Sequence, residues 1–361
     1  MILRKTDEEE LSPIIIYNDH LGGLEYIWPL LEKRFRQAGH RRPLIFKEYD
    51  CYKELPGTDG DLYTYDAIVL SALTDKRFFR SLPKSVSFGH VFPWVTEKTK
   101  IRQRSYGVPF MLCSNALICR RKDDLHVRNI MELDERIAIP MRSMVMFYFV
   151  QAVCENLSLK KSFRVMEHLL ELIGGRDALA GSGSDDYDGI NRFEHGECRY
   201  LLGFTEDLYE LKNGDYTVSF ANFSCHEEIR RPRFLADFVS IGKHVSKDKL
   251  QDCLDLIRIL TSEEFIFELC TYGDSLRYLL PADRCVFLRL AEKNALYGRL
   301  FEQLDSAENN VLRYGRSFYE NFYKQRDVLL QLLWEKAGWR LPFEEKGRIW
   351  LASKHMKQKK A

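Results

Sequence analysis

Cys113 closes the apolar stretch Gly107 to Leu112, which is typical of a buried β-strand, and a second strand-like stretch begins at Ala116. A thiol at a strand end can face a cleft, where a neighbouring base would convert it to the reactive thiolate. A lone cysteine in an apolar run is more often a small core residue. Cys113 is therefore a candidate nucleophile that needs support from other parts of the chain.

Glu206 follows a second apolar stretch in the same way. Arg199 to Phe204 is typical of a buried strand, and Glu206 lies at the start of the short helix expected after it. In open α/β sheets, ligands bind at the carboxyl ends of the strands, so this carboxylate is a candidate site residue. The alternative is an ordinary acid in the first turn of a helix, with Thr205 as the cap.

Three further residues could contribute to a site. Asp237 precedes the expected strand Phe238 to Ile241 and is either a site residue at a strand edge or a turn acid. Tyr17, at the end of the first expected strand, and Tyr52 could form flat aromatic walls for a planar ligand, or they could be ordinary packing residues.

Several other kinds of chemistry have little support. The histidines lack close metal-ligand spacing, so we expect neither a metal site nor a cofactor. No G-x-S-x-G motif is present for serine catalysis. The nine cysteines are an odd number without a C-x-x-C pair, which argues against a disulfide framework and a zinc ribbon.

Length and charge narrow the class of ligand. A chain of 361 residues is long enough for two lobes, and a formal net charge of +1 provides no general attraction for nucleic acid or acidic membranes. We therefore expect a small-molecule ligand. The sequence shows no secretory signal and no apolar stretch long enough to span a bilayer, so we expect a soluble, cytoplasmic protein.

Strand and helix patterns alternate along the first half of the chain, as in an α/β protein with parallel strand pairing. The expected strands there are 13–17, 44–46 and 66–70, with a helix over 24–38. Two helices follow over 143–157 and 162–173, the second ended by Gly174-Gly175. An acidic loop at 181–189, a strand at 238–241 and helices at 249–260, 263–270, 285–293 and 318–336 complete the prediction.

In four segments, the chain resembles the thiaminase I (thiamine pyridinylase) family. These are Tyr49-Asp50-Cys51-Tyr52, the run from Gly107-Val108-Pro109 through Cys113-Ser114-Asn115 to Arg120-Arg121-Lys122, Gly203-Phe204-Thr205-Glu206, and Tyr278-Leu279-Leu280-Pro281-Ala282. Phe193, Gly196 and Asp237-Phe238-Val239-Ser240 add to the likeness.

The resemblance implies a two-lobed α/β fold of the type II periplasmic-binding-protein class, with a ligand cleft between the lobes and a helical C-terminal part. We expect a first lobe of residues 1–125 and 236–283, a second lobe of residues 126–235, and C-terminal helices over 284–361 that pack on the lobes.

The resemblance also implies the chemistry. Cys113 would add to the pyrimidine ring of thiamine, Glu206 would deprotonate the thiol, and the thiazole would be exchanged for a small nucleophile of the pyridine, aniline or thiol type. Asp237 would hydrogen-bond the aminopyrimidine, and Tyr17 and Tyr52 would flank the rings.

One departure from the family pattern concerns the substrate. Ser71, in Val69-Leu70-Ser71-Ala72, stands where the family has an acidic residue, which would weaken binding of a cationic substrate or change the pyrimidine accepted. This departure keeps open a related transferase that acts on another heteroaromatic substrate. A second alternative is a binding protein that keeps the two-lobed fold and captures a small molecule without turnover.

Overall fold

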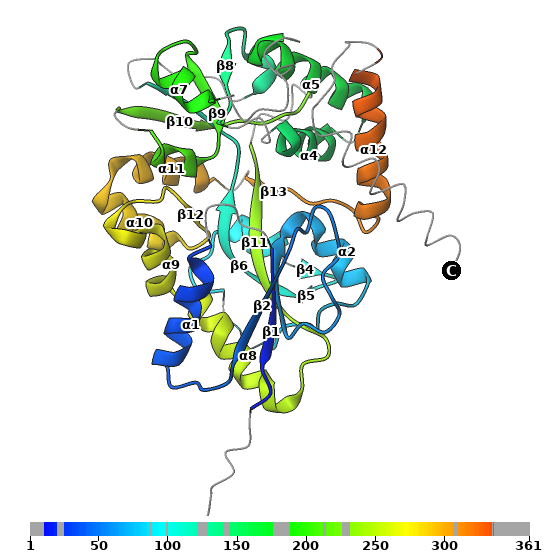
Figure 1. Cartoon of the computed structure of the whole chain (residues 1–361), viewed down its shortest axis with the longest axis vertical. Helices are drawn as coiled ribbons and strands as arrows, with labels where there is room; N and C mark the ends of the chain where they lie inside the picture. Colours follow the sequence, from blue (N-terminus) through cyan, green and yellow to red (C-terminus); the bar gives the residue numbers. More distant parts are fainter. Residues whose placement is uncertain are drawn as a thin grey trace, which may run out of the picture. The chain divides into compact units, whose positions relative to one another are not determined.

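The structure is a computed structural model that describes residues 11–19, 25–84, 86, 88–98, 100–120, 129–140, 145–156, 158–175, 188–211, 214–225, 232–306, 309–333 and 335. The chain divides into two compact units (Figure 1). Unit 1 comprises Met1–Cys113, Phe234–Phe301 and Asp305–Arg316, and unit 2 comprises Ser114–Arg233, Glu302–Leu304 and Ser317–Ala361. Most of the expected acidic loop at 181–189 lies outside the described residues.

Unit 1 contains a seven-stranded mixed sheet with the order β12-β6-β11-β3-β1-β2, in which β13 also pairs with β11. These strands are β1 (Ile14–Asp19), β2 (Leu44–Tyr49), β3 (Leu62–Asp66), β6 (Gly107–Cys113), β11 (Arg233–Ile241), β12 (Leu280–Pro281) and β13 (Asn310–Val311). The expected parallel pairing is confirmed for β1 with β2 and for β1 with β3. By contrast, β11 runs antiparallel to both of its main neighbours, β3 and β6.

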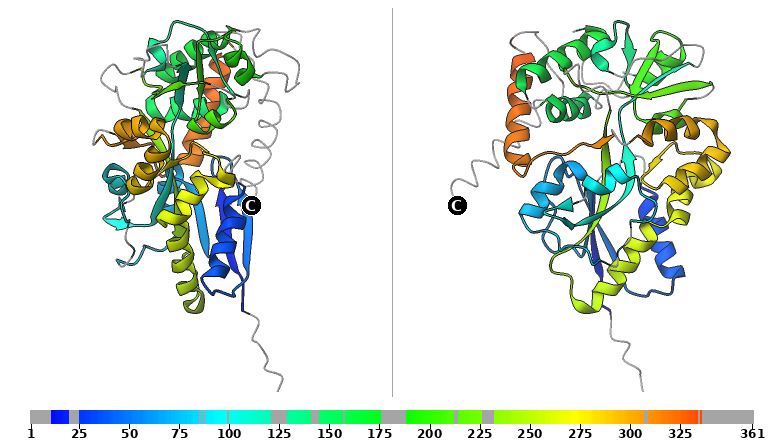
Figure 2. Two further views of the ribbon diagram at one scale, coloured as in Figure 1. Left: turned by 90° about the vertical axis from the view of Figure 1, so that its left-hand side faces the viewer. Right: turned by 180° about the vertical axis from the view of Figure 1, so that it is seen from behind.

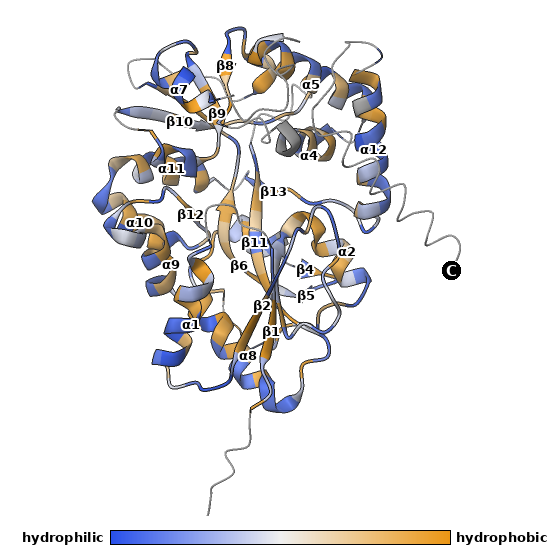
Figure 3. Ribbon diagram, viewed as in Figure 1, coloured by the Kyte–Doolittle hydropathy of each residue, from blue (hydrophilic) through white to orange (hydrophobic). Residues whose placement is uncertain are grey.

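Helices accompany this sheet in unit 1, and the last of them passes into unit 2 at Glu302. They are α1 (Ile27–Gln37), α2 (Leu70–Asp75), α3 (Pro93–Lys98), α8 (Lys247–Leu260), α9 (Glu263–Cys270), α10 (Arg284–Lys293) and α11 (Ala295–Leu304), with the 3-10 turns η1 (Ala67–Val69) and η5 (Tyr272–Asp274) and the short pair β4 (Lys100–Ile101) and β5 (Arg104–Ser105). Helices α1 and α8 lie side by side (Figure 2). Each buries residues at helical spacing, and β6 is mainly hydrophobic (Figure 3), so sheet and helices share an apolar core.

The expected strand at 66–70 is wrong. The strand is Leu62–Asp66, and the apolar run after it turns into η1 and then α2. The cause is Asp66, whose carboxylate accepts a hydrogen bond of 2.7 Å from the backbone N–H of Ile68. This N-cap contact ends the strand and starts the helical turn, although Ile68 and Val69 favour a strand by type.

Unit 2 contains a four-stranded sheet with the order β10-β7-β9-β8. Its strands are β7 (Ala116–Arg120), β8 (Ile137–Ala138), β9 (Tyr200–Gly203) and β10 (Tyr216–Phe220). Its helices are α4 (Val145–Asn156), α5 (Leu159–Ile173), α7 (Gly189–Glu194) and α12 (Phe318–Leu332), with the 3-10 turns η2 (Ile130–Glu132) and η4 (Thr205–Tyr209). Gly174 ends α5 with a φ of 129°, which confirms the predicted stop.

The change of unit falls after Cys113, whereas the expected first lobe extended to residue 125. The difference arises because β7 pairs with β9 and β10 in the second sheet instead of continuing the first. Of the C-terminal helices, α10 belongs to unit 1 and α12 to unit 2. Within the described part of the chain, no helix has the length and apolar character needed to cross a membrane.

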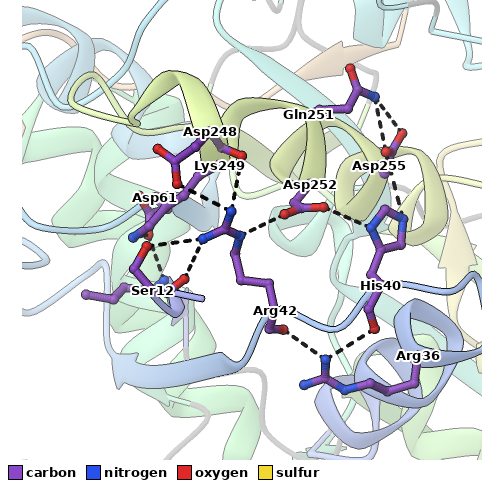
Figure 4. A network of polar contacts seen from close by, with 11 residues as sticks. Ser12, Arg36, His40, Arg42, Asp61, Asp248, Lys249, Gln251, Asp252 and Asp255 are labelled. Carbon is purple, nitrogen blue, oxygen red and sulfur yellow. Dashed lines mark hydrogen bonds and ion pairs between the residues drawn. The ribbon is translucent and has the colours of Figure 1, made fainter. Parts of the chain in front are cut away.

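A polar network fixes α8 to the segment that leads from α1 into β2 (Figure 4). Its centre is Arg42, which is only 5% exposed and donates to Asp252 Oδ2 at 2.7 Å and to the backbone oxygen of Ser12 at 2.8 Å. The other oxygen of Asp252 lies 2.9 Å from His40 Nδ1, and Asp248 Oδ2 lies 3.3 Å from Arg42. A buried guanidinium with all these partners holds two segments in one register.

We predict that Arg42→Ala lowers the free energy of unfolding by about 3 kcal/mol, because the partly buried Asp252 loses the guanidinium that pairs with its Oδ2 atom and the backbone oxygen of Ser12 loses this donor. Urea unfolding would measure the loss. Arg258→Ala is the matched control, since Arg258 is 60% exposed and pairs with Asp255 on the same helix; we expect it to cost at most about 0.5 kcal/mol. Equal effects of the two variants would contradict a structural role for the network.

Candidate functional site

Cys113 is the one partly exposed residue of β6, after six buried residues. It forms no disulfide bond. The expectation that an apolar strand stops at a thiol is therefore confirmed, and the thiol is not enclosed in the core as the alternative required. Six of the other cysteines are buried, while Cys225 and Cys285 are partly exposed.

The register of β11 places two carboxylates on the same sheet face as Cys113. Cys113 lies opposite Leu235, and Asp237 lies opposite both Met111 on β6 and Asp66 on β3. Residues directly opposite on antiparallel strands share a face, and so do residues two apart on one strand. Cys113 and Asp237 are thus diagonal neighbours, which are typically separated by about 7 to 8 Å, with a somewhat shorter distance between the Cβ atoms.

We expected Asp237 to precede its strand, but it lies within the strand. The strand begins at Arg233, and the register with β6 shifts at Asp237 and Phe238, where Phe110 is the extra residue of a bulge. Asp237 is partly exposed between buried neighbours. A bulge of this kind redirects side chains and is common beside active sites.

Asp66 is a further candidate site residue, which the sequence reasoning missed. It is 4% exposed, accepts from the Tyr52 hydroxyl at 3.0 Å and faces Asp237 across the sheet. Burial raises the pKa of Asp66 to about 7, while the hydrogen bonds from Ile68 and Tyr52 act in the opposite direction. The available signal was an acid directly before an apolar run at a strand end.

A second buried acid, Asp19, lies near Asp66. Asp19 ends β1, is 4% exposed and accepts from the backbone N–H of Cys51 at 2.8 Å. Its negative charge contributes to the raised pKa of Asp66. Burial, followed by the charges of these two acids, raises the pKa of the Cys51 thiol well above its usual value, so this cysteine stays protonated. Unit 1 thus concentrates acidic groups at one end of β1 and β3.

Glu206 lies in unit 2, directly after the edge of the sheet where β9 ends. Burial raises the pKa of its carboxyl to about 7, and Thr205 Oγ1 donates to it at 3.1 Å. The backbone N–H of Phe204 is satisfied by Asp207 instead, at 2.7 Å. Thr205 therefore does not cap the turn, and Asp207 rather than Glu206 fills the capping role.

Gly203 explains part of the Gly-Phe-Thr-Glu segment. A Cβ atom at this position would lie 2.1 Å from Asp207 Oδ2. Only glycine leaves room for the Asp207 carboxylate that caps η4. The capped η4 turn then fixes the position of Glu206. In this motif, Asp207 caps the turn, and the turn holds the neighbouring Glu206 in place.

The structure gives Tyr17 and Ser71 other partners. The Tyr17 hydroxyl donates to Asp59 at 2.7 Å, and its ring stacks on Tyr63 with centroids 5.6 Å apart. The Ser71 hydroxyl accepts from Arg313 at 3.1 Å. Cys113, Asp237 and, through Asp66, Tyr52 share one part of unit 1, whereas no hydrogen bond among the described residues joins Tyr17 or Ser71 to them.

Two other features do not add chemistry. Among the residues that the structure describes, no group of three histidine, cysteine or acidic side chains could hold a metal ion. A surface hollow of about 290 Å³ between α1 and the α8–α9 region is lined by Arg34, Gln37 and Phe265, among others, and contains none of the predicted site residues.

We predict that stability falls as pH rises through the titration of Glu206. An unfolded glutamate loses its proton near pH 4.5 and the folded one near pH 7, so the folded state binds the extra proton between these values. Glu206→Gln should therefore lose less unfolding free energy than the unchanged protein between about pH 5 and about pH 8 in urea titrations. Glu197→Gln, at an exposed position, should match the unchanged protein; identical pH slopes for all three would refute the raised pKa.

The whole chain was compared with known protein families, proteins and solved structures. No protein-family model matches the chain. Thiaminase-1 of Paenibacillus thiaminolyticus is 24% identical over 321 residues, which cover 75% of this chain and 76% of that protein. At this distance, the sequence likeness supports common ancestry over most of both chains.

Solved structures show the same fold. Clostridium botulinum thiaminase I in complex with thiamin has a TM-score of 0.74 at 19% identity, covering 89% of this chain and 99% of the other. A eukaryotic thiaminase-I bound to 3-deazathiamin has a TM-score of 0.65 at 17% identity, covering 88% and 100%. Thermus thermophilus maltotriose binding protein has a TM-score of 0.63 at 14% identity, covering 90% and 95%. The expected fold, that of type II periplasmic binding proteins, is thus confirmed.

Proposed function

Because the chain is a distant homologue of thiaminase I and has its fold, we propose that it is a thiamine-degrading transferase with Cys113 as nucleophile. The observation that carries the proposal is the position of Cys113, the partly exposed end of a buried strand, on the same sheet face as Asp237 and Asp66. A thiol beside an acidic group that can bind a cationic or amino-bearing ring suits thiamine, which has both features.

In the proposed reaction, the thiolate of Cys113 adds to the pyrimidine carbon next to a ring nitrogen, and the electron pair moves into the ring. The bond from the bridging methylene to the thiazolium nitrogen then breaks, and that nitrogen keeps the pair, so that neutral thiazole leaves. A second nucleophile adds to the methylene carbon, and expulsion of the thiolate restores the aromatic ring. The covalent intermediate divides one difficult displacement into easier steps.

Glu206 is the proposed base for the thiol. A general base works best when its pKa lies near the operating pH, and burial raises the pKa of Glu206 to about 7. Asp207 caps the turn, which leaves the Glu206 carboxylate available for proton transfer. Thr205, which is fully buried, donates to Glu206 and orients it.

The acids of unit 1 are proposed to bind the substrate. Asp237 would accept from the ring amino group, and Asp66, held by Tyr52, would supply negative potential for the thiazolium cation. Asp66 thereby offers a carboxylate in a chain that has Ser71 where the family has an acid. The pairing of Ser71 with Arg313 indicates that this position has taken a structural role instead.

A binding protein without turnover is the second candidate. The same fold occurs in a maltotriose binding protein and in maltose-bound MalE3 of T. maritima, which has a TM-score of 0.64. A shared fold hosts both classes, so the site chemistry must separate them. A partly exposed Cys113 together with a base of raised pKa favours the transferase.

We predict that the purified protein consumes thiamine only when a pyridine, aniline or thiol co-substrate is present, and that Cys113→Ser abolishes this exchange while thiamine binding persists. Mass spectrometry of the products would establish the exchange. Cys285→Ser is the matched control, because Cys285 is also partly exposed in unit 1 but lies on α10. Thiamine that is bound and recovered intact would show a binding protein; normal exchange by Cys113→Ser would exclude Cys113 as nucleophile.

We predict that Glu206→Gln slows alkylation of Cys113 by iodoacetamide about tenfold or more at neutral pH, because the amide cannot accept the thiol proton. The rate should recover as the pH approaches the ordinary thiol pKa, where hydroxide replaces the base. The control is Glu197→Gln, which removes an exposed carboxylate from the same unit. An unchanged alkylation rate in Glu206→Gln would remove this residue from the base role.

A further inference from the structure

A buried chain of amide and carboxyl groups lies in unit 2, beginning at Asn115. Asn115, Gln151 and Glu155 are 1%, 2% and 3% exposed. Asn115 Nδ2 donates to Gln151 Oε1, and Gln151 Nε2 donates to Glu155 Oε1 at 2.7 Å. The second carboxylate oxygen, Glu155 Oε2, accepts from the backbone N–H of Phe223 at 2.8 Å. Three side chains thus form one directed series of hydrogen bonds.

The ionised carboxylate determines the direction of the series. A carboxylate only accepts, so Gln151 must turn its NH₂ group to Glu155 and its oxygen to Asn115. Asn115 must then present its own NH₂ group to Gln151, which leaves Asn115 Oδ1 at the open end. This oxygen is buried and has no hydrogen-bond partner among the described residues. A buried acceptor without a donor is unfavourable unless a further molecule supplies one.

The open end lies close to the candidate nucleophile along the chain. Two residues span at most about 7 Å, so the Cα atom of Asn115 is within this distance of that of Cys113 however the units are placed. The backbone oxygen of Asn115 accepts from Ala221 N at 2.9 Å, which fixes its position at the sheet edge. Ala116 pairs with Gly203, so Asn115 lies at the same edge of this sheet as the turn that contains Glu206.

We propose that Asn115 is a specificity-determining residue whose Oδ1 accepts a hydrogen bond from the ring amino group of the substrate, and that Glu155, acting through Gln151, is the positioning residue that keeps this oxygen at the open end. The inference rests on the proposed function. An amino group has two N–H donors, so one of them can serve Asn115 while the other stays available for a second acceptor. An analogue with a ring carbonyl in place of the amino group would bring two acceptors face to face.

The charge state of Glu155 supports the direction. Burial raises the pKa of Glu155 to about 7, against the hydrogen bonds from Gln151 and Phe223 and the charge of Arg233. The carboxylate form therefore prevails at about pH 8, which is the condition for the assays below. An ordered water as the donor to Asn115 is the competing explanation, and it predicts no effect on substrate choice.

The test compares thiamine with its analogue in which a ring carbonyl replaces the amino group. In Asn115→Leu, kcat/KM for thiamine should fall about 10- to 100-fold, and that for the analogue should change little. The same loss of preference should appear in calorimetric binding of both compounds to Cys113→Ser carrying Asn115→Leu. An unchanged preference overturns the proposal and favours the buried water.

Glu155→Gln provides a second, independent test. Its amide oxygen can still accept from Phe223, while its NH₂ group can donate to Gln151 Oε1, and the whole series then reverses. Asn115 would present NH₂ at the open end, so the preference should shift toward the carbonyl analogue. If Asn115→Leu does not fold, Glu155→Gln is sufficient to test the proposal. An unchanged preference for thiamine over the carbonyl analogue in Glu155→Gln would again overturn the proposal.

Asn156→Leu is the matched control. Asn156 is equally buried on the same helix, but it donates to Ala152 O and Phe223 O and accepts from Cys225 N, so no atom is left open. It should lower the melting temperature without altering the ratio of kcat/KM values. If the unchanged protein neither binds nor converts thiamine, the proposed function fails and the inference with it. An active protein whose preference ignores Asn115 overturns the inference alone.

Discussion

The pairing of β11 is the constraint on which the rest of unit 1 depends. This strand enters the middle of the sheet from residue 233 and runs antiparallel to β6 and β3, which are themselves far apart in sequence. Its register brings Asp237 opposite Asp66 and makes Cys113 a diagonal neighbour of Asp237. A slip of one residue would turn Asp237 to the other face and bury its carboxylate among apolar side chains. The extra residue of the bulge, Phe110, belongs to β6 and falls between the partners of Asp237 and Phe238, on the side away from Cys113, and the pairing of β11 with β3 stays continuous.

Three carboxyl groups carry the chemistry proposed for the two units, and burial raises the pKa of each to about 7. Each carboxyl group accepts a hydrogen bond from a side chain: a tyrosine hydroxyl for Asp66, a glutamine amide for Glu155 and a threonine hydroxyl for Glu206. Acids whose pKa is raised by burial oppose folding when they are ionised, and they are typical of functional positions, where local stability is given up for reactivity. The network around Arg42 is different in kind, because there every charge has an opposite partner and the result is a fixed register.

Much of the fold could be predicted from local patterns. The apolar strand that ends at Cys113, the helices of the second half and the stop at Gly174 follow from periodicity and from glycine chemistry. Asp66 could not be found in this way, because its role depends on a register with residue 237, and its own cap turned an apparent strand into a helical turn. The placement of Tyr17 against Asp59 depends on a loop packed over its hydroxyl, and no spacing rule predicts such a contact. The series that begins at Asn115 joins two loop segments, at Asn115 and Phe223, to helix α4, so it becomes visible only in the folded chain.

The close approach of Asp207 to Gly203 links the evolutionary histories of two positions. A Cβ atom at 203 would lie 2.1 Å from the carboxylate of Asp207 that caps the turn and 2.9 Å from Pro140 Cγ, so a shorter residue 207 would remove the closer of two conflicts. The order of events then matters: a lineage that keeps the aspartate is confined to glycine, whereas one that has lost it still needs Pro140 to shift before position 203 can vary. A library randomised at 203 alone should therefore return mainly glycine, and small side chains should emerge when positions 140, 203 and 207 vary together.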